Sequence, residues 1–455
     1  MRYFGVVNRF SAILAVLMTF GLVQQKAAAQ QLPCDIYAAA GTPCCGAYST
    51  VRKLYSTYTG LLYQVRRTSD NATMNIGANT PGADQDAFLG TGAGTISRLY
   101  DQSGRGNDLT VAKKGSYSGT ASQNDNEANA KGKSIMFNGR KAYAVYINPV
   151  EGYRNNQEGY TGYPATAPLG NGIPTGNQAQ GSYALEDGAR ANVGNACCFN
   201  FGTASRNNAA GPRGGMNALF FGICTYWDKG AGSGPWFMVD VEAGVYAGGN
   251  PNNNLPSSRF DYAFGLTKNN STNITIRVAN STALYGAAAP SLVNALNGNP
   301  PATWQVPGGI TLGIGGDNSN SSNGTFYEGC IVNGRPSDAT DAAVLDNVRL
   351  AGYGSSIPVS VSSGSKDAAT ASMFSVCYNP SSAKAVISYT LPDSRKVSMS
   401  IFNAKGRRIA AIVNGINTAG PHKAVWDTKR VPAGAYICRV AIDGMGERTE
   451  KITIQ

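Results

Sequence analysis

Short runs of apolar and β-branched residues, separated by clusters of Gly, Asn and Ser, dominate residues 30 to 354 of this chain. Representative runs lie at 134–137, 142–147, 218–221 and 273–278. Runs of this length between turn residues are typical of β-strands. Convincing helical periodicity is scarce, and segments 49–63 and 339–351 are the best candidates for short amphipathic helices. The pattern predicts an all-β domain built as a sandwich or jelly roll.

The two ends of the chain differ from this β-rich segment. Residues 1–29 begin with Arg2 and Arg9, continue with an apolar run and end in three alanines, which predicts a secretory signal peptide. The apolar run is short for a membrane span, so a retained anchor is the less favoured alternative. We expect no other segment to cross a membrane.

A low-complexity Ser/Ala stretch at 355–372 predicts a flexible linker between two domains. Residues 30–354 precede it as the main domain, and residues 373–455 follow it as a small second β module. Six strands are expected in this module, at 385–390, 397–402, 409–413, 423–426, 435–440 and 449–454.

The positive charge of the chain is unevenly distributed. Residues 30–372 carry 23 Lys/Arg against 22 Asp/Glu, whereas residues 373–455 carry twelve against five. A nearly neutral main domain is not expected to bind nucleic acid, because that binding depends on neutralising phosphates. The net charge of +11 therefore says little about the main domain's ligand.

Nine cysteines in an exported chain favour disulfides over metal sites, and the odd number leaves at least one thiol without a partner in the same chain. Cys34 and Cys44 bracket a short loop that a disulfide could close. The pairing of the other seven cysteines stays open at this point, among them Cys45, Cys224, Cys330, Cys377 and Cys438.

The single histidine, His422, lies in the C-terminal module, away from any catalytic cluster. Nucleophile systems built on Ser-His or Cys-His, and the usual catalytic zinc sites, are therefore not expected in the main domain. No Gly-rich phosphate-binding fingerprint opens a βαβ unit. We expect no cofactor and no metal, and chemistry based on carboxylates.

Three acids are the candidates for that chemistry. Asp240 and Glu242 are two residues apart in a run of β-formers, so on a strand they would face the same way. Asp317 follows an apolar run in a Gly-rich turn. Two carboxylates brought together by the fold can cleave a glycosidic bond. The competing interpretations are a solvated strand face for the pair and a simple turn residue for Asp317, with Glu328 as a rival acid.

Several ordered motifs between residues 33 and 353 resemble glycoside hydrolase family 54, the secreted α-L-arabinofuranosidases. These motifs are Cys34-Asp-Ile-Tyr37, Leu99-Tyr-Asp-Gln-Ser-Gly104, Gly152-Tyr-Arg-Asn-Asn156, Ala196-Cys-Cys-Phe199, Gly234-Pro-Trp236, Asp240-Val-Glu242, and Gly313-Ile-Gly-Gly-Asp-Asn-Ser-Asn320 followed by Gly324-Thr-Phe-Tyr-Glu-Gly329. The resemblance implies a concanavalin-like β-sandwich and a retaining mechanism, with Glu242 as nucleophile and Asp317 as general acid/base.

The same resemblance implies the residues that hold the sugar. Asp240 would accept hydrogen bonds from sugar hydroxyls, and Gly316 and Asn318 would lie beside the sugar. Trp227 would form an aromatic wall. Cys197 and Cys198 would form a vicinal disulfide that lines the same pocket.

The resemblance ends before the C-terminal module. The arabinose-binding β-trefoil that usually follows the catalytic domain is missing, and residues 373–455 instead resemble Ig-like modules of bacterial secreted proteins, including sorting domains. This suggests a bacterial, secreted protein whose module engages secretion or surface machinery, with attachment to the cell surface as one outcome.

The resulting hypothesis is a monomeric exo-acting α-L-arabinofuranosidase that trims arabinoxylan or arabinan. A β-D-xylosidase or bifunctional enzyme is one alternative, because the two sugars can present similar hydroxyl geometry. A lectin-like carbohydrate-binding protein that has lost catalysis is the other.

Overall fold

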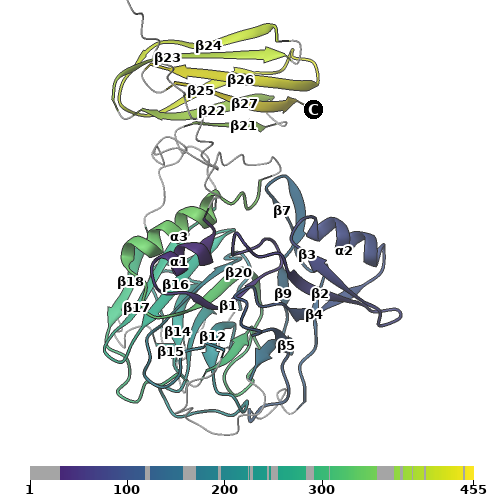
Figure 1. The fold of residues 1–455 in the computed structure, drawn as a ribbon, viewed down its shortest axis with the longest axis vertical. Coiled ribbons are helices and arrows are strands. Elements are labelled where there is room, and N and C mark those ends of the chain that lie inside the picture. Colours follow the sequence, from purple (N-terminus) through teal and green to yellow (C-terminus); the bar gives the residue numbers. More distant parts are fainter. Residues whose placement is uncertain are drawn as a thin grey trace, which may run out of the picture.

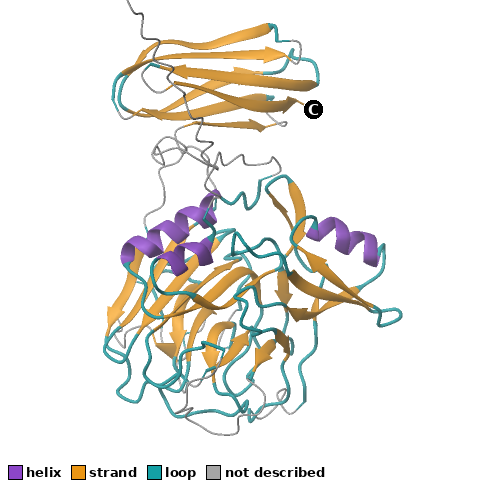
Figure 2. Cartoon of the chain, viewed as in Figure 1, coloured by secondary structure: helices purple, strands orange, loops and turns teal. Residues whose placement is uncertain are grey.

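The computed structural model describes residues 31–117, 123–156, 171–192, 196–223, 225, 229–242, 245–246, 255–282, 292–306, 308–355, 374–379, 383–391, 393–403, 406–443 and 446–454. The predicted signal peptide, and the predicted linker apart from Ser355, lie outside these residues. The described chain is mostly β, as the sequence predicts (Figures 1 and 2). Its three helices are α1 (Pro33–Ala39), α2 (Pro81–Leu89) and α3 (Asp338–Leu350).

Two antiparallel layers make up most of the main domain. We call the first the helix-side sheet, in the order β18 (Val293–Gly298), β17 (Ile274–Asn280), β16 (Ala263–Asn269), β11 (Gln180–Glu186), β20 (Gly324–Asn333) and β1 (Cys44–Ser49). The second is the site sheet, in the order β15 (Val245–Tyr246), β14 (Trp236–Asp240), β13 (Asn217–Gly222), β12 (Asn200–Ala204), β19 (Gly309–Leu312), β10 (Tyr153–Asn155) and β5 (Leu109–Val111).

Shorter strands join the two sheets at one edge. Strand β4 (Gly94–Leu99) pairs with β5 of the site sheet and with β2 (Leu61–Arg67) and β6 (Ala128–Asn129); β2 also pairs with β3 (Thr73–Gly77). Strand β6 contacts β9 (Val145–Ile147), which pairs with β20 of the helix-side sheet. A separate hairpin is formed by β7 (Ser134–Phe137) and β8 (Arg140–Tyr143). The domain is therefore a sandwich closed along one side.

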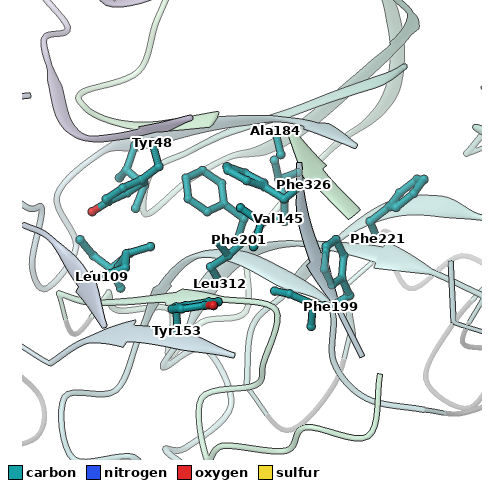
Figure 3. Packing of buried hydrophobic residues seen from close by; sticks show 14 of the residues in the cluster. Tyr48, Leu109, Val145, Tyr153, Ala184, Phe199, Phe201, Phe221, Leu312 and Phe326 are labelled. Carbon is teal, nitrogen blue, oxygen red and sulfur yellow. The ribbon is translucent and has the colours of Figure 1, made fainter. Parts of the chain in front are cut away.

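Aromatic side chains fill the space between the sheets. Phe326 of the helix-side sheet packs near Phe201 of the site sheet, with ring centroids 5.0 Å apart, and Tyr153 and Leu312 belong to the same buried cluster (Figure 3). Each fully buried Phe or Leu contributes about 1.5–3 kcal/mol by leaving water. The other face of the helix-side sheet is covered by α1 and α3, which bury a second cluster.

The helical predictions had mixed outcomes. Helix α3 agrees with the prediction at 339–351; it begins after Ser337, whose hydroxyl accepts a hydrogen bond from the Thr340 amide at 3.1 Å. The predicted helix at 49–63 is wrong. There, β1 ends at Ser49, a loop follows, and β2 begins at Leu61. The Ser49 hydroxyl accepts from the Val51 and Arg52 amides, and Arg52 pairs with Glu328, so tertiary contacts override the local periodicity.

The C-terminal module contains two sheets around its own core. One sheet has the order β21 (Phe374–Asn379), β22 (Lys384–Leu391) and β25 (Gly420–Asp427), and the other β24 (Arg408–Asn417), β23 (Arg395–Asn403), β26 (Gly434–Ile442) and β27 (Gly446–Ile454). Alternate residues of both sheets, such as Ile387 and Met399, are buried together. The six predicted strands fall within β22–β27, and β21 was not predicted.

Four cysteines of the main domain lie in α1, β1 and β20. Cys34 and Cys44 form a disulfide that ties α1 to β1, and Cys45 and Cys330 are buried thiols. Cys438 is a buried thiol in the C-terminal module. Over the described residues, the helices are too short or too polar to cross a membrane.

Candidate active site

The register of the site sheet brings one row of residues to its outer face. Arg154, Thr311, Gly202, Ala218 and Asp240 are direct partners across β10, β19, β12, β13 and β14. Direct partners in a sheet point to the same face. The neighbouring row points into the sandwich core and contains Tyr153, Leu312, Phe201, Leu219 and Val239.

Gly202 and Ala218 are the small members of the outer row. An added Cβ at Gly202 would lie 2.5 Å from the Cα of Ala218, so the backbones of β12 and β13 approach each other closely at this point of the row. The alternation of strand residues thus explains how a charged row and an apolar core occur on opposite faces of the same five strands.

Asp240 is the last residue of β14 and is only 6% exposed. The Asn200 amide donates to its Oδ2 at 2.8 Å, and the backbone N–H of Glu242 donates to its Oδ1 at 3.0 Å. Burial raises the pKa of Asp240 to about 6, although these two donors oppose the rise; the nearby charge of Asp317 adds to it. Asp240 is therefore not a residue of a solvated strand face.

Glu242 lies beyond the end of β14, with φ at 62°. The expectation that Asp240 and Glu242 share a strand face is therefore wrong, because the backbone enters the left-handed region at Glu242. Such a conformation is uncommon for a non-glycine residue and is often found at functional sites. The side chain is 7% exposed and packs against Gly316, where an added Cβ would lie 2.1 Å from Glu242 Oε2.

The electrostatic surroundings of Glu242 disfavour its charge. Burial raises its pKa to about 8, and the carboxylates of Asp240 and Asp317 contribute to the rise. The backbone N–H of Gly211 and the guanidinium of Arg154 oppose it. Because these acids interact, their protons belong to the group as a whole and not to one residue. The site can therefore hold a proton at neutral pH.

Asp317 reaches the same place from the loop that follows β19. Its side chain is half-buried, and its Oδ1 accepts a hydrogen bond from the Ser319 amide at 2.9 Å. This bond is the local turn contact that Asp often makes, so Asp317 also fits the simpler interpretation of a turn residue. Its charge nevertheless acts on both Asp240 and Glu242, which places the three acids together.

A disulfide between Cys197 and Cys198 lies next to these acids. Both sulfur atoms and a carboxylate oxygen of Asp240 lie within 4.8 Å of one another. The hydroxyl of Ser319 lies 3.7 Å from the sulfur of Cys197 and 3.6 Å from that of Cys198. The sulfur pair thus connects the end of β14 with the Asp317 loop and gives the site a polarisable apolar surface.

The remaining predicted site residues differ in their placement. Gly316 lies against Glu242, as described above. Asn318 is fully buried, and its amide donates to Asp125 Oδ1 at 3.1 Å. Trp227 lies outside the described residues, as does Cys224.

Glu328, the rival acid, occupies a different environment. It is fully buried in β20, and Arg52 contacts both of its oxygens, at 2.6 and 2.7 Å. The hydroxyls of Tyr183 and Tyr353 also donate to it. Its side-chain partners among the described residues are thus an arginine and two tyrosines of the helix-side core, and none of the three acids of the site is among them.

Sequence reasoning missed three residues that support the acids: Asn200, Arg154 and Asp125. Asn200 directly follows the Ala196–Phe199 motif, and Arg154 lies within the 152–156 motif, but neither had been given a role. Asp125 belongs to no motif. Its position became evident only from its contacts with Asn318 and Asn320.

Comparisons with known proteins give matches to two parts of the chain. The family described as "Alpha-L-arabinofuranosidase B, catalytic" matches residues 33–354, and the secretion system C-terminal sorting domain matches residues 376–455. A probable alpha-L-arabinofuranosidase B of Aspergillus clavatus is 42% identical over 352 residues, covering 74% of this chain and 66% of that protein.

Two further similarities extend this result. An arabinofuranosidase/B-xylosidase of Trichoderma koningii is 42% identical, over 70% of this chain and 63% of its own. A crystal structure of arabinofuranosidase complexed with arabinofuranosyl-alpha-1,2-xylobiose superposes with a TM-score of 0.64 at 35% identity, covering 85% of this chain and 74% of that one. The chain thus spans about two thirds of the length of the curated relatives.

Proposed function

This chain belongs to the alpha-L-arabinofuranosidase B catalytic family of glycoside hydrolases, and on that premise we propose that it is an exo-acting, retaining α-L-arabinofuranosidase. The observation that carries the proposal is the grouping of Asp240, Glu242 and Asp317 around one face of the site sheet. Two carboxyl groups are the equipment that a double displacement at an anomeric carbon requires.

In the proposed reaction, the carboxylate of Glu242 attacks the anomeric carbon of a terminal arabinofuranosyl group. Asp317 protonates the departing glycosidic oxygen, so a glycosyl-enzyme forms and the alcohol leaves. Asp317 then takes a proton from water, which attacks the anomeric carbon and releases Glu242. The reaction needs the shared proton on Asp317 and an ionised Glu242 when the sugar is bound.

Asp240 fits the role of a sugar-binding acceptor. Its two bonds from Asn200 and the Glu242 amide orient the carboxylate, and its raised pKa indicates that it gains from further donors such as sugar hydroxyls. Gly316 and the 197–198 disulfide would contact the same sugar. Asn318 is proposed to support the sugar from beneath as part of the Asp317 loop, because its side-chain amide already donates a hydrogen bond to Asp125.

The proposed natural substrates are the arabinofuranosyl side chains of arabinoxylan and arabinan. The relative crystallised with arabinofuranosyl-alpha-1,2-xylobiose supports a xylan-linked substrate. A second activity as β-D-xylosidase is favoured by one observation, the similarity to the arabinofuranosidase/B-xylosidase of Trichoderma koningii. A non-catalytic lectin is disfavoured, because both acids that catalysis needs are present.

The C-terminal match to a sorting domain indicates export. We propose that the catalytic domain is delivered outside the cell or displayed on its surface, where polymeric plant cell-wall substrates are accessible.

The test is hydrolysis of 4-nitrophenyl α-L-arabinofuranoside by the wild type, Glu242→Gln and Asp317→Asn. Glu242→Gln should lose activity by a factor of about 10³ or more, and Asp317→Asn should lose more on poor leaving groups than on nitrophenol. Proton NMR of the first product should show a retained anomeric configuration. Full activity of Glu242→Gln, or an inverted product, would refute the assignment.

A further inference from the structure

The Gly-Tyr-Arg-Asn-Asn motif at 152–156 takes no part in the proposed mechanism, yet its arginine lies beneath the site. Tyr153 of β10 points into the sandwich core, so its neighbour Arg154 points to the site face. Arg154 is only 3% exposed. Arg154 and Asp240 lie at the two ends of the same outer row, and Gly202 and Ala218 lie between them.

The guanidinium of Arg154 holds the backbone that precedes Asp317. Its Nη1 donates to the carbonyls of Gly315 and Gly316, each at 3.0 Å. Its Nη2 donates to the carbonyl of Ser205 at 2.5 Å, and its Nε to Asn156 Oδ1 at 3.0 Å. The planar fork of an arginine suits this task, since several carbonyls can be held at once in fixed directions.

The positive charge of Arg154 has no contact ion pair within the part of the chain that the structure describes. A buried cation bonded only to neutral acceptors is costly unless opposite charges lie nearby. Here burial lowers the pKa of Arg154 to about 10, and the carboxylates of Glu242, Asp317 and Asp125 oppose that change. Arg154 also bonds the carbonyl of Gly316, the residue that packs against the Glu242 carboxylate, so its charge lies close to the proposed nucleophile.

Asp125 holds the same loop from the other side. Its Oδ1 accepts from the amides of Asn318 at 3.1 Å and Asn320 at 2.5 Å, and its carboxyl is 6% exposed. The residues just before Asp317 are thus held by an arginine, and those after it by an aspartate. The backbone carbonyl of Asp317 itself accepts from the Tyr117 amide at 3.1 Å.

We propose that Arg154 is a positioning residue with two separable effects: its hydrogen bonds fix the Gly315–Gly316 backbone that presents Asp317, and its charge favours the ionised form of Glu242. This inference rests on the proposed function, because it assumes that Glu242 must be ionised to attack. Among the described residues, the charged groups that act on Glu242 are Asp240, Asp317 and Arg154, and Arg154 is the cation of this set.

The two effects predict different behaviour for two substitutions, made in the full chain. Arg154→Met removes the charge and the hydrogen bonds but keeps much of the volume. It should lower kcat and move the acid limb of kcat/KM to higher pH by about one unit, because a neighbouring cation has been lost. Arg154→Lys keeps a charge but not the fork. Its acid limb should stay near that of the wild type while kcat falls about tenfold.

A merely structural arginine would give another result. If Arg154→Met folds and has reduced activity but the same pH dependence of kcat/KM as the wild type, the charge effect is overturned. If Arg154→Lys has the kcat of the wild type, the positioning effect is overturned. If Arg154→Met does not fold, Arg154→Lys decides alone, since a shifted acid limb in that variant would also contradict the charge effect. Arg67→Met, which removes a half-buried arginine that pairs with the exposed Asp70, is the matched control and should leave both measurements unchanged.

A second readout does not depend on activity. The titration of Glu242 can be followed by ¹³C labelling of glutamate carboxyls, with the resonance assigned by its loss in Glu242→Gln. Its midpoint should rise in Arg154→Met and stay within a few tenths of a unit in Arg154→Lys. An unchanged midpoint in Arg154→Met would refute the inference even if the wild type hydrolysed no arabinofuranoside, whereas inactivity of the wild type with a shifted midpoint would refute only the proposed function.

Discussion

The Cα of Gly316 lies directly against the carboxylate of Glu242, so that a Cβ at residue 316 would be 2.1 Å from Glu242 Oε2 and 3.3 Å from the sulfur of Met216. The position before the proposed acid/base therefore has to be glycine if the proposed nucleophile is to keep its place. This contact couples two loops that are more than seventy residues apart in the sequence.

Gly316→Ala should consequently lower kcat on 4-nitrophenyl α-L-arabinofuranoside by about 100-fold, because the new methyl group displaces the Glu242 carboxylate from its reactive position. Thermal unfolding should change much less. Gly77→Ala is the control, since a Cβ there meets no atom within 4 Å. Wild-type kcat in Gly316→Ala would show that the carboxylate does not need this position.

Glu242→Gln should stabilise the protein at high pH. A raised carboxyl pKa means that the folded protein keeps a proton that the unfolded chain releases, so stability falls as pH rises from 4.5 to about 8. Removing the carboxyl removes this loss. The melting temperature of the catalytic domain, measured by calorimetry, should therefore rise in the variant more at pH 8 than at pH 5.

The control for this experiment is Asp346→Asn, an amide replacement on the exposed side of α3. Its melting temperature relative to the wild type should be the same at both pH values. An equal gain at pH 5 and pH 8 in Glu242→Gln would contradict the expected protonation of the site.

Glu328→Gln should lower the stability of the folded protein and leave its catalytic activity nearly unchanged. The substitution removes the charge that compensates the buried guanidinium of Arg52, and breaking such a pair costs about 3 kcal/mol. The activity of the folded fraction, normalised by circular dichroism, should remain within about twofold of the wild type, since the proposed reaction makes no use of this carboxyl. Asp317→Asn should show the opposite behaviour. A large loss of kcat in well-folded Glu328→Gln would instead support Glu328 as a catalytic acid.

Asn200→Ala should weaken substrate binding. Asp240 Oδ2 would lose its donor while remaining buried, which costs about 1–3 kcal/mol and corresponds to roughly 5- to 150-fold in kcat/KM. The pKa of Asp240 should rise further, because the lost bond opposes that rise. Steady-state kinetics between pH 4 and 8 would measure both effects. Asn75→Ala, which removes an exposed side-chain amide, should have no effect.

The sequence was sufficient to predict the strand-rich architecture, helix α3 and most strands of the C-terminal module, because these depend on local periodicity. It was not sufficient at 49–63, where a loop replaces the predicted helix. There the Ser49 hydroxyl accepts hydrogen bonds from the Val51 and Arg52 amides, and Arg52 forms an ion pair with Glu328. Nor did it predict that Glu242 leaves the strand with a positive φ, since a turn at that point is decided by packing against Gly316.

For the site, the sequence by itself determined which residue types were available: three acids, a pair of adjacent cysteines and a single distant histidine. The tertiary structure decided how they are combined. Strand register places Asp240 and Arg154 in one row, and loop contacts bring Asp317 to Glu242. Glu328 instead forms an ion pair with Arg52. Register and loop packing are properties of chain segments far apart in sequence, and local patterns do not encode those distances.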